Sequence, residues 1–379
     1  VGLATQQLRS LNTAAVSALT NTALEGLATD QLAALTTAQV RAIGTDTVAE
    51  LDAAVVANLT STQVRALTTA QVAALGTDQL EVLSPSQLLR LDSAQMQALS
   101  VDQLNSLGTA QFQALTSRQI GALGSEQLVN LASDDLQALS STQLRGLGTA
   151  ALAALDSTDL ALLTSGQLAG LTTVQLRALE SNDLPGIGTD VLGALSGAQI
   201  GALTSGQLSA LTDAQWQSLG SAQLRGLGSA QLQSLGTETL NLLTTDQFQA
   251  LSSAQIAALT TAQFANLGGD DLAALTTAQV RSIELRDLAA LNSADLASML
   301  PTQLAALGSA QLRALATDAL AGLGATALAA LGTAQVAALS NSQLAALASD
   351  QMQALTSDQV RALGTAQLAA LGSDDLNQL

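Results

Sequence analysis

A large aliphatic residue occupies every eighth position of this chain, from Leu3 to Leu379. Of these 48 positions, 44 are Leu, three are Ile and one is Met. The residues three places earlier, from Leu8 to Leu376, are apolar without exception. Because this register never slips, the chain is a tandem repeat of one eight-residue unit, the octad. Octad positions are numbered one to eight below, with the recurrent Leu at position eight.

Each octad predicts one short helix. Position one is Thr, Ser, Gly, Asp or Asn in 39 of 47 octads, and these residues are preferred at helix N-caps. Position four is Gln in 31 octads and Asp in seven, so Ser or Thr followed by Gln forms a capping box. Gly at position one is also expected to end the preceding helix in a left-handed conformation. The helix should begin at position two and end near position eight.

Longer elements are excluded by the period. In one continuous helix an eight-residue repeat would drift about 80° per octad, so the apolar stripe would circle the axis. A strand would need period two, which never appears. We therefore expect an all-α fold, an α-solenoid superhelix of short helices of about six to seven residues, one per octad. Positions five and eight should form its continuous core, including the aromatic residues Phe112, Trp216, Phe248 and Phe264.

The same pattern predicts one uninterrupted domain. Residues 1–379 should form a single continuous solenoid of about 47 octads, extended into a rod. Two stretches, 180–187 and 283–301, are irregular, and we interpret them as tolerated drift rather than as bends or contact sites. Pro185 falls inside the helix of its octad, whereas Pro85 and Pro301 fall at the first helical position, where proline is favoured. The chain opens within a repeat, so we expect a fragment or a processed chain.

Composition narrows the function classes. The net charge is −18, from 30 acidic residues against 12 arginines, which disfavours nucleic acid and anionic membranes as partners. No apolar run is long enough for membrane insertion. Position six carries most of the arginines and should face solvent. We interpret them as a source of solubility rather than as a binding stripe: Arg9, Arg41, Arg65, Arg145, Arg177, Arg225, Arg281, Arg313 and Arg361.

Catalytic chemistry is not indicated. The chain lacks His, Cys, Lys and Tyr, and its many Ser and Thr are explained as caps. We therefore predict no enzyme, no catalytic residue, no cofactor and no metal site. The Asp pairs 134–135, 270–271 and 374–375 are weak candidates for Ca²⁺ at best. Gln at position four could form amide ladders between coils, but its capping role is sufficient and is favoured.

The end-to-end unit Leu-Thr-Thr-Ala-Gln-Val-Ala-Ala-Leu resembles octad tracts of large bacterial surface or secreted proteins, often labelled adhesin-like or haem-utilisation-like. The resemblance covers the whole chain and implies an extracellular or cell-surface location. It transfers no functional residues, and haem finds no His, Cys or Tyr ligand here.

Two functions are compatible with these features. The first is a non-enzymatic structural protein that forms a rigid extracellular rod or fibre, as a stalk, a spacer or a self-assembling filament. Its partners would be copies of itself, end to end or side by side, or a cell-surface or glycan partner. The alternative is a binding module that recognises glycan, ice or protein through a regular solenoid face.

Overall fold

The computed structural model describes residues 4–377 and 379, and it contains one short helix per octad. The helices are four to six residues long and begin at position two, except that η2 begins at position four; η1 and η2 are 3₁₀ helices. No strand occurs among the described residues. The predicted all-α architecture is therefore confirmed. The chain divides into two compact units, Val1–Leu195 and Ser196–Leu379, which are considered separately below.

Unit 1 contains twenty-two α-helices, then η1 and one further α-helix. Their bounds are α1 Thr5–Ser10, α2 Thr13–Ser17, α3 Asn21–Glu25, α4 Thr29–Ala34, α5 Thr37–Ala42, α6 Thr45–Glu50, α7 Ala53–Ala57, α8 Ser61–Ala66, α9 Thr69–Ala73, α10 Thr77–Glu81, α11 Pro85–Leu88, α12 Ser93–Ala98, α13 Val101–Asn105, α14 Thr109–Ala114, α15 Ser117–Ile120, α16 Ser125–Val129, α17 Ser133–Ala138, α18 Ser141–Leu144, α19 Thr149–Leu152, α20 Ser157–Leu162, α21 Ser165–Gly170, α22 Thr173–Ala178, η1 Ser181–Gly186 and α23 Thr189–Gly193.

Unit 2 continues the same pattern and includes η2. Its helices are α24 Gly197–Ile200, α25 Ser205–Ser209, α26 Asp213–Ser218, α27 Ser221–Leu224, α28 Ser229–Ser234, α29 Thr237–Asn241, α30 Thr245–Ala250, α31 Ser253–Ala257, α32 Thr261–Phe264, α33 Gly269–Ala274, α34 Thr277–Ser282, α35 Leu285–Leu288, α36 Ser293–Ser298, α37 Pro301–Leu304, α38 Ser309–Ala314, η2 Ala319–Gly322, α39 Ala325–Ala329, α40 Thr333–Val336, α41 Asn341–Ala345, α42 Ser349–Gln353, α43 Ser357–Arg361, α44 Thr365–Ala370 and α45 Ser373–Leu376.

Position one is the N-cap, as predicted, but its glycines are not left-handed. Gly108, for example, has φ −76° and ψ 160°, and no described residue has a positive φ. The position eight before such a glycine is also extended, as at Ile43, which precedes Gly44 and has φ −63° and ψ 132°. The helix thus ends by straightening rather than through a left-handed residue. The expectation of a left-handed Gly at position one is wrong.

Positions five and eight form the core of each unit. Val72 and Leu75 in unit 1 and Phe248 and Leu251 in unit 2 are at most 4% exposed. The four aromatic residues at position five are fully buried, which confirms their assignment to the core. Short helices of this kind are unstable alone, so burial of two large side chains per octad must stabilise them.

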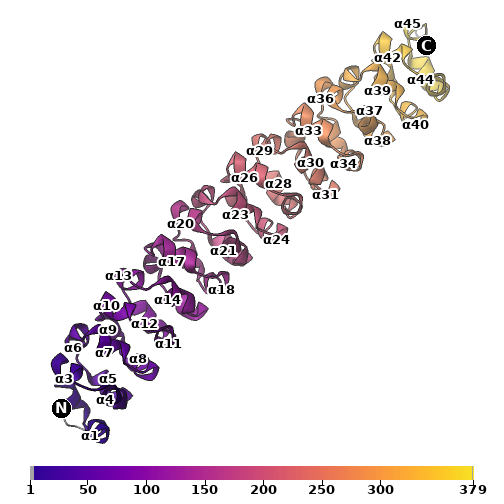
Figure 1. The fold of residues 1–379 in the computed structure, drawn as a ribbon. Coiled ribbons are helices and arrows are strands. Elements are labelled where there is room, and N and C mark those ends of the chain that lie inside the picture. The colour runs from indigo at the N-terminus through magenta and orange to yellow at the C-terminus, as the bar shows by residue number, and fades with distance from the viewer. Residues whose placement is uncertain (1–3, 378) are drawn as a thin grey trace. The chain divides into compact units, whose positions relative to one another are not determined.

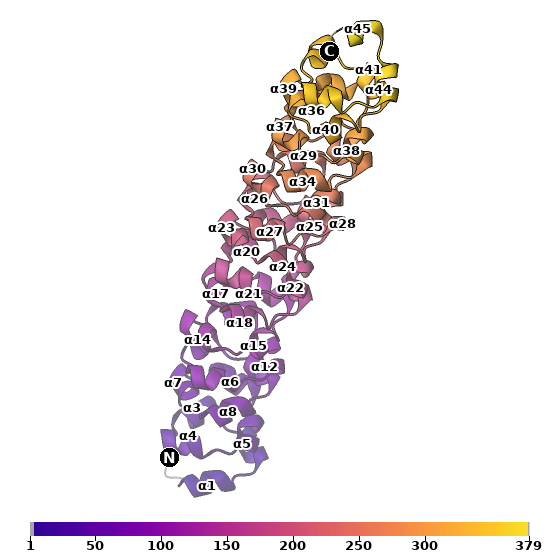
Figure 2. The same ribbon diagram turned by 90° about the vertical axis from the view of Figure 1, so that its right-hand side faces the viewer.

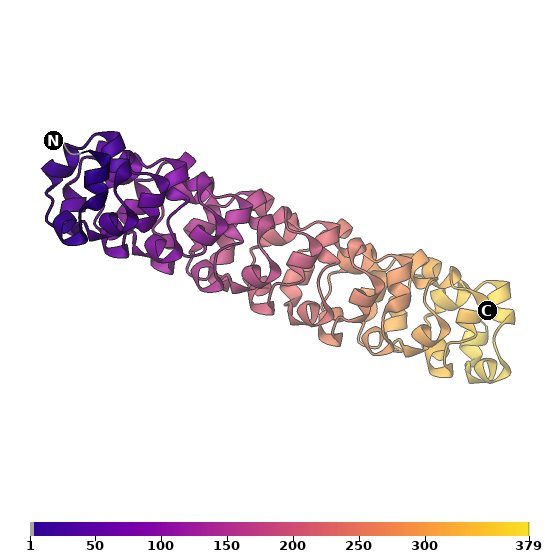
Figure 3. The ribbon, with the colours of Figure 1, turned by 90° about the horizontal axis from the view of Figure 1, so that it is seen from below.

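Contacts between octads define the coil. Helices three octads apart pack together, such as α2 with α5 in unit 1 and α31 with α34 in unit 2. Hydrogen bonds also reach back four octads, from Gln39 to Leu8 and from Gln279 to Phe248. Each turn therefore contains between three and four octads. Figures 2 and 3 show, within each unit, short helices on several sides of a shared interior.

The two 3₁₀ helices share a close contact rather than a proline. A Cβ atom on Gly186 of η1 would lie 2.1 Å from the Ser157 carbonyl oxygen, and on Gly322 of η2 it would lie 2.0 Å from that of Ser293. Each helix packs against the octad three earlier, α20 or α36. Pro185 lies inside η1, whereas η2 contains no proline. The tight approach at position seven, with no Gln at position four, is common to both.

The irregular stretch 283–301 keeps the octad pattern. It spans α35 and α36 and reaches the start of α37, with Pro301 at the first helical position as predicted. Pro85 starts α11 in the same way. The substitutions at 284–287 change the polar contacts of this region, described below, without interrupting the succession of helices.

Candidate functional site

The glutamine at position four joins two successive coils. Its Oε1 accepts the N–H of position one, as Gln39 does from Thr36 at 2.8 Å. Its Nε2 donates to two carbonyl oxygens of the octad four earlier, those of Leu8 at 2.7 Å and Leu11 at 2.9 Å. Gln39 is 2% exposed, so its amide is satisfied inside the protein. We call this three-bond arrangement the glutamine clamp.

The clamp recurs in both units. Gln71 bonds Val40 and Ile43, and Gln279 bonds Phe248 and Leu251, again through Nε2. The predicted capping role is confirmed. These amides donate to backbone carbonyls rather than to one another, so the clamps are not amide ladders. A capping box accepts either Glu or Gln, yet Glu never occupies position four, and that bias was the sequence signal for a required donor.

Aspartate at position four lacks the two amide donors. Burial, together with the neighbouring charge of Asp134, raises the pKa of Asp135 to about 6. Burial also raises the pKa of Asp159 in unit 1 and of Asp271 in unit 2, although each accepts a backbone N–H that opposes the shift. A carboxylate at this position is therefore costly when ionised.

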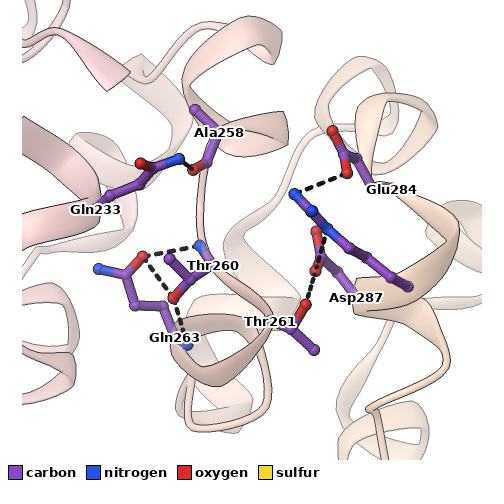
Figure 4. A network of polar contacts seen from close by, with 8 residues as sticks. Gln233, Ala258, Thr260, Thr261, Gln263, Glu284 and Asp287 are labelled. Atoms are coloured by element: carbon purple, nitrogen blue, oxygen red, sulfur yellow. Dashed lines mark hydrogen bonds and ion pairs between the residues drawn. The ribbon is translucent and has the colours of Figure 1, made fainter. Parts of the chain in front are cut away.

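Asp287 is the most enclosed of these carboxylates (Figure 4). It is fully buried, and its Oδ1 accepts a 2.6 Å hydrogen bond from the Thr261 hydroxyl. Arg286 Nε lies 3.5 Å from the same oxygen, while Arg286 also pairs with Glu284 at 2.8 Å. The Oδ2 atom of Asp287 has no hydrogen-bond partner among the described residues. The Asp is thus held by one hydroxyl and a largely exposed guanidinium.

Polar side chains at position six make a second contact between coils. Arg41 Nε donates to the Ala66 carbonyl at 3.0 Å, three octads ahead, and Arg313 bonds Ala338 in the same way. Asn105 and Gln233 make the equivalent bond through their amides, the latter to Ala258 (Figure 4). The arginines are exposed, as predicted. Several of them also tie one coil to the next, which the sequence did not reveal: Arg9, Arg41, Arg145, Arg225, Arg281 and Arg313.

The seven arginines of unit 1 lie on one side of its coil. Their octads follow one another at intervals of three or four, which is one turn each time. Direct contacts join these octads in series, including Arg41 with Ala66, Gln119 with Leu88, and Ser117 with Thr142. We call this row the arginine stripe: Arg9, Arg41, Arg65, Arg90, Arg118, Arg145 and Arg177.

The acidic residues of unit 1 gather away from the stripe. Ten of its seventeen acids lie on α3, α6, α10, α13, α17, α20 or their caps, and η1 with its cap adds two. These octads also recur every three or four and follow the arginine octads by one or two, about half a turn. Figure 1 shows α3, α6, α10, α13, α17 and α20 along one edge of unit 1, and α8, α11 and α18 along the other. We call the first set the acidic side.

Two adjoining hollows lie on the arginine stripe. One, of about 280 Å³, is lined by Arg65, Arg90 and Arg118, and the other, of about 520 Å³, by Arg41 and Arg65. Asp92 borders both, but its side chain caps α12 through the Gln95 N–H at 2.9 Å. Within the described part of unit 1, no arginine forms an ion pair.

The Asp pairs named as weak Ca²⁺ candidates stay separate from other ligands. Asp134–Asp135 and Asp270–Asp271 begin α17 and α33. No group of three His, Cys, Asp or Glu residues placed to hold a metal occurs among the described residues. The side chains of Asp374–Asp375 lie outside those that the structure describes.

The repeat matches a known family model, the ALTTAQ repeat. Eleven overlapping matches cover residues 56–165, 176–213, 216–269 and 304–379, which is well over half of the chain. The chain belongs to the ALTTAQ repeat family. The six letters occur literally at 34–39, where they run from position seven to the clamp Gln at position four. The name of the family thus spans the N-cap and the clamp Gln of this chain.

No curated protein matches the chain. Membership of the ALTTAQ repeat family indicates a structural repeat protein. In the described part of the structure, no helix has both the length and the hydropathy to cross a membrane.

Proposed function

We propose that this chain is a non-enzymatic structural element that forms a rigid extracellular rod or fibre, as a stalk, a spacer or a filament subunit. The observation that carries the proposal is the glutamine clamp. Each clamp buries an amide that joins two coils through backbone carbonyls, as Gln71 does at 1% exposure. Such bonds resist separation of coils along the axis of each unit, which is what a spacer under tension requires.

The lack of catalytic groups supports the same proposal. The chain has no His, Cys, Lys or Tyr, and its buried glutamines are occupied with backbone partners. An acidic chain without cysteine also suits export, because its folding needs no disulfide. These features support a bacterial surface location as part of the proposal.

Electron microscopy of the purified chain tests the proposal. The sharpest variant duplicates residues 60–115, seven octads that should add about two coils. Particles should be elongated and lengthen by a constant increment. A matched control carries the same insertion with Ser at every position eight, which adds mass without a core and should not lengthen the particle. Compact particles in all samples would contradict a rod.

The rival function, a binding module for glycan, ice or protein, is favoured by one feature, the arginine stripe with its hollows. A signal from the chain in a glycan-array or ice-recrystallisation assay would support this alternative, whether the particles are elongated or compact.

A further inference from the structure

We propose that the arginine stripe of unit 1 is an interaction surface for the acidic side of a second copy of this chain, so that copies associate side by side. The inference rests on the structural role proposed above and names the partner through which a fibre would thicken.

Matched spacing identifies the partner. Arginine octads and acidic octads both recur once per turn, because both follow the coil of between three and four octads. Two parallel copies can therefore align many opposite charges in one register. A single exposed pair contributes little, but a row of pairs held on rigid helices adds up.

The guanidinium groups of the arginine stripe are available to bind carboxylates of another molecule. All seven arginines are exposed, and none forms an ion pair within the described part of unit 1. The bond from Arg41 Nε to Ala66 fixes the guanidinium while using one of its five N–H donors. The acidic side likewise presents exposed carboxylates, such as Glu25 and Glu81 at position six.

A polyanion fits this surface less well. One arginine per coil gives a sparse row, whereas nucleic acid carries about one charge per 1.7 Å of duplex. A second copy offers most of its unit 1 acids at the spacing of the arginines.

Deletion of one uncharged octad tests the alignment without changing any charge. Removing residues 68–75 rotates everything that follows by between a quarter and a third of a turn, and so separates Arg9, Arg41 and Arg65 from the rest of the stripe. Removing residues 228–235 is the matched control, since it also deletes one uncharged octad but lies in unit 2.

Sedimentation velocity of the full chain gives the readout. At about 20 mM salt the parent and the 228–235 deletion should associate, and at about 500 mM, where the Debye length falls to roughly 4 Å, they should not. The 68–75 deletion should associate roughly tenfold more weakly at low salt, with an unchanged circular dichroism spectrum per residue. Equal association of both deletions would overturn the proposal.

Charge reversal identifies the partner surface. R41E/R65E/R118E and E25R/E50R/E81R should each lose self-association, and their mixture should recover it, because each supplies the surface the other lacks. Failure of the mixture to associate would overturn the assignment. A parent chain that remains monomeric at low salt but binds heparin or polyphosphate would assign the stripe to a polyanion instead. Monomeric elongated particles would leave the rod standing while removing its lateral partner.

Discussion

Units 1 and 2 are built from the same octad but carry their charges differently. Both bury positions five and eight, and both contain glutamine clamps, such as those of Gln71 and Gln279. In unit 1 no octad carries both an arginine and an acid. In unit 2 two octads do, 284–291 and 356–363, and the ion pairs of the described residues occur there.

The difference separates what folding requires from what it leaves open. Positions one, four, five and eight are constrained alike in both units, because they provide caps, clamps and core. Charges occupy mainly positions three and six, which are largely exposed and tolerate either sign. Segregation of charge in unit 1 is therefore not imposed by the fold. The surface on which the charges of unit 1 are segregated is therefore where we expect a function of this unit.

The feature common to both units, the octad register, should give the largest effect when broken. Deleting four residues, 68–71, brings every later Leu of unit 1 to the wrong side, and two or more Leu per coil lose their burial at about 1.5–3 kcal/mol each. We expect the thermal unfolding curve to split or to lose its unit 1 component. The eight-residue deletion 68–75 should unfold nearly as the parent does. Equal tolerance of both would refute the stacked coil.

The clamp should be equally important in the two units. Gln71→Glu and Gln279→Glu keep the acceptor for position one but place a carboxylate against two carbonyl oxygens. Each should cost about 2–4 kcal/mol of unfolding free energy, since two bonds are lost and buried acceptors lose their donor. Urea denaturation would measure it. A cost in only one unit would show that the clamp is not the shared element. Gln353→Glu, at position six, is a comparison substitution at an exposed site.

Asp135 should make unit 1 more stable in mild acid. Its folded pKa of about 6 exceeds its usual 3.8, so the folded state binds the proton more tightly. Stability therefore falls as pH rises from about 4 through 6 and is regained on acidification, by about 1–3 kcal/mol for this group. Asp135→Asn should remove this slope. Asp135→Gln should do the same and also stabilise at pH 7, by supplying the missing clamp. Denaturation midpoints measured between pH 4 and 7 test this prediction. A steeper dependence of stability on pH in the Asp135→Asn variant would contradict it.

The mixed charges of unit 2 should have the smallest effect. Arg361 and Asp358 are both 79% exposed and lie 3.1 Å apart. Arg361→Gln should change the unfolding free energy by no more than about 0.5 kcal/mol. Its effect on self-association should also be small, unlike R41E/R65E/R118E. A loss of association in Arg361→Gln would show that segregation in unit 1 is not the deciding difference.

The sequence predicted what one octad determines. The N-cap, the start at position two, the buried pair and the proline positions of α11 and α37 all follow from local preference and periodicity. The coil does not, because its turn depends on the angle between successive helices. Because the number of octads per turn was unknown, neither the clamp from Gln39 to Leu8 nor the alignment of the arginines could be derived. Gly at position one was misread, since the extended residue before it already ends the helix.

The second 3₁₀ helix was missed for a related reason. Pro185 drew attention to 180–187, whereas η2 at Ala319–Gly322 has no unusual residue of its own. Its close contact lies three octads away, where α36 leaves no room for a Cβ atom at Gly322. These two features do not form a sequence rule, because octad 20–27 also has Gly at position seven and no Gln at position four, yet it forms the α-helix α3.

The reach of the clamp also sets how the chain folds. Its hydrogen bonds join residues 28 and 31 apart, and those from Arg41 and its counterparts join residues 25 apart, however long the chain becomes. A typical separation of about 30 in 379 residues is a relative contact order of roughly 0.08, in the range of fast-folding helical proteins. Each coil is complete once about thirty further residues have emerged. Such a chain can fold progressively from the end that leaves a ribosome or a secretion channel first, and none of these contacts has to wait for the other end.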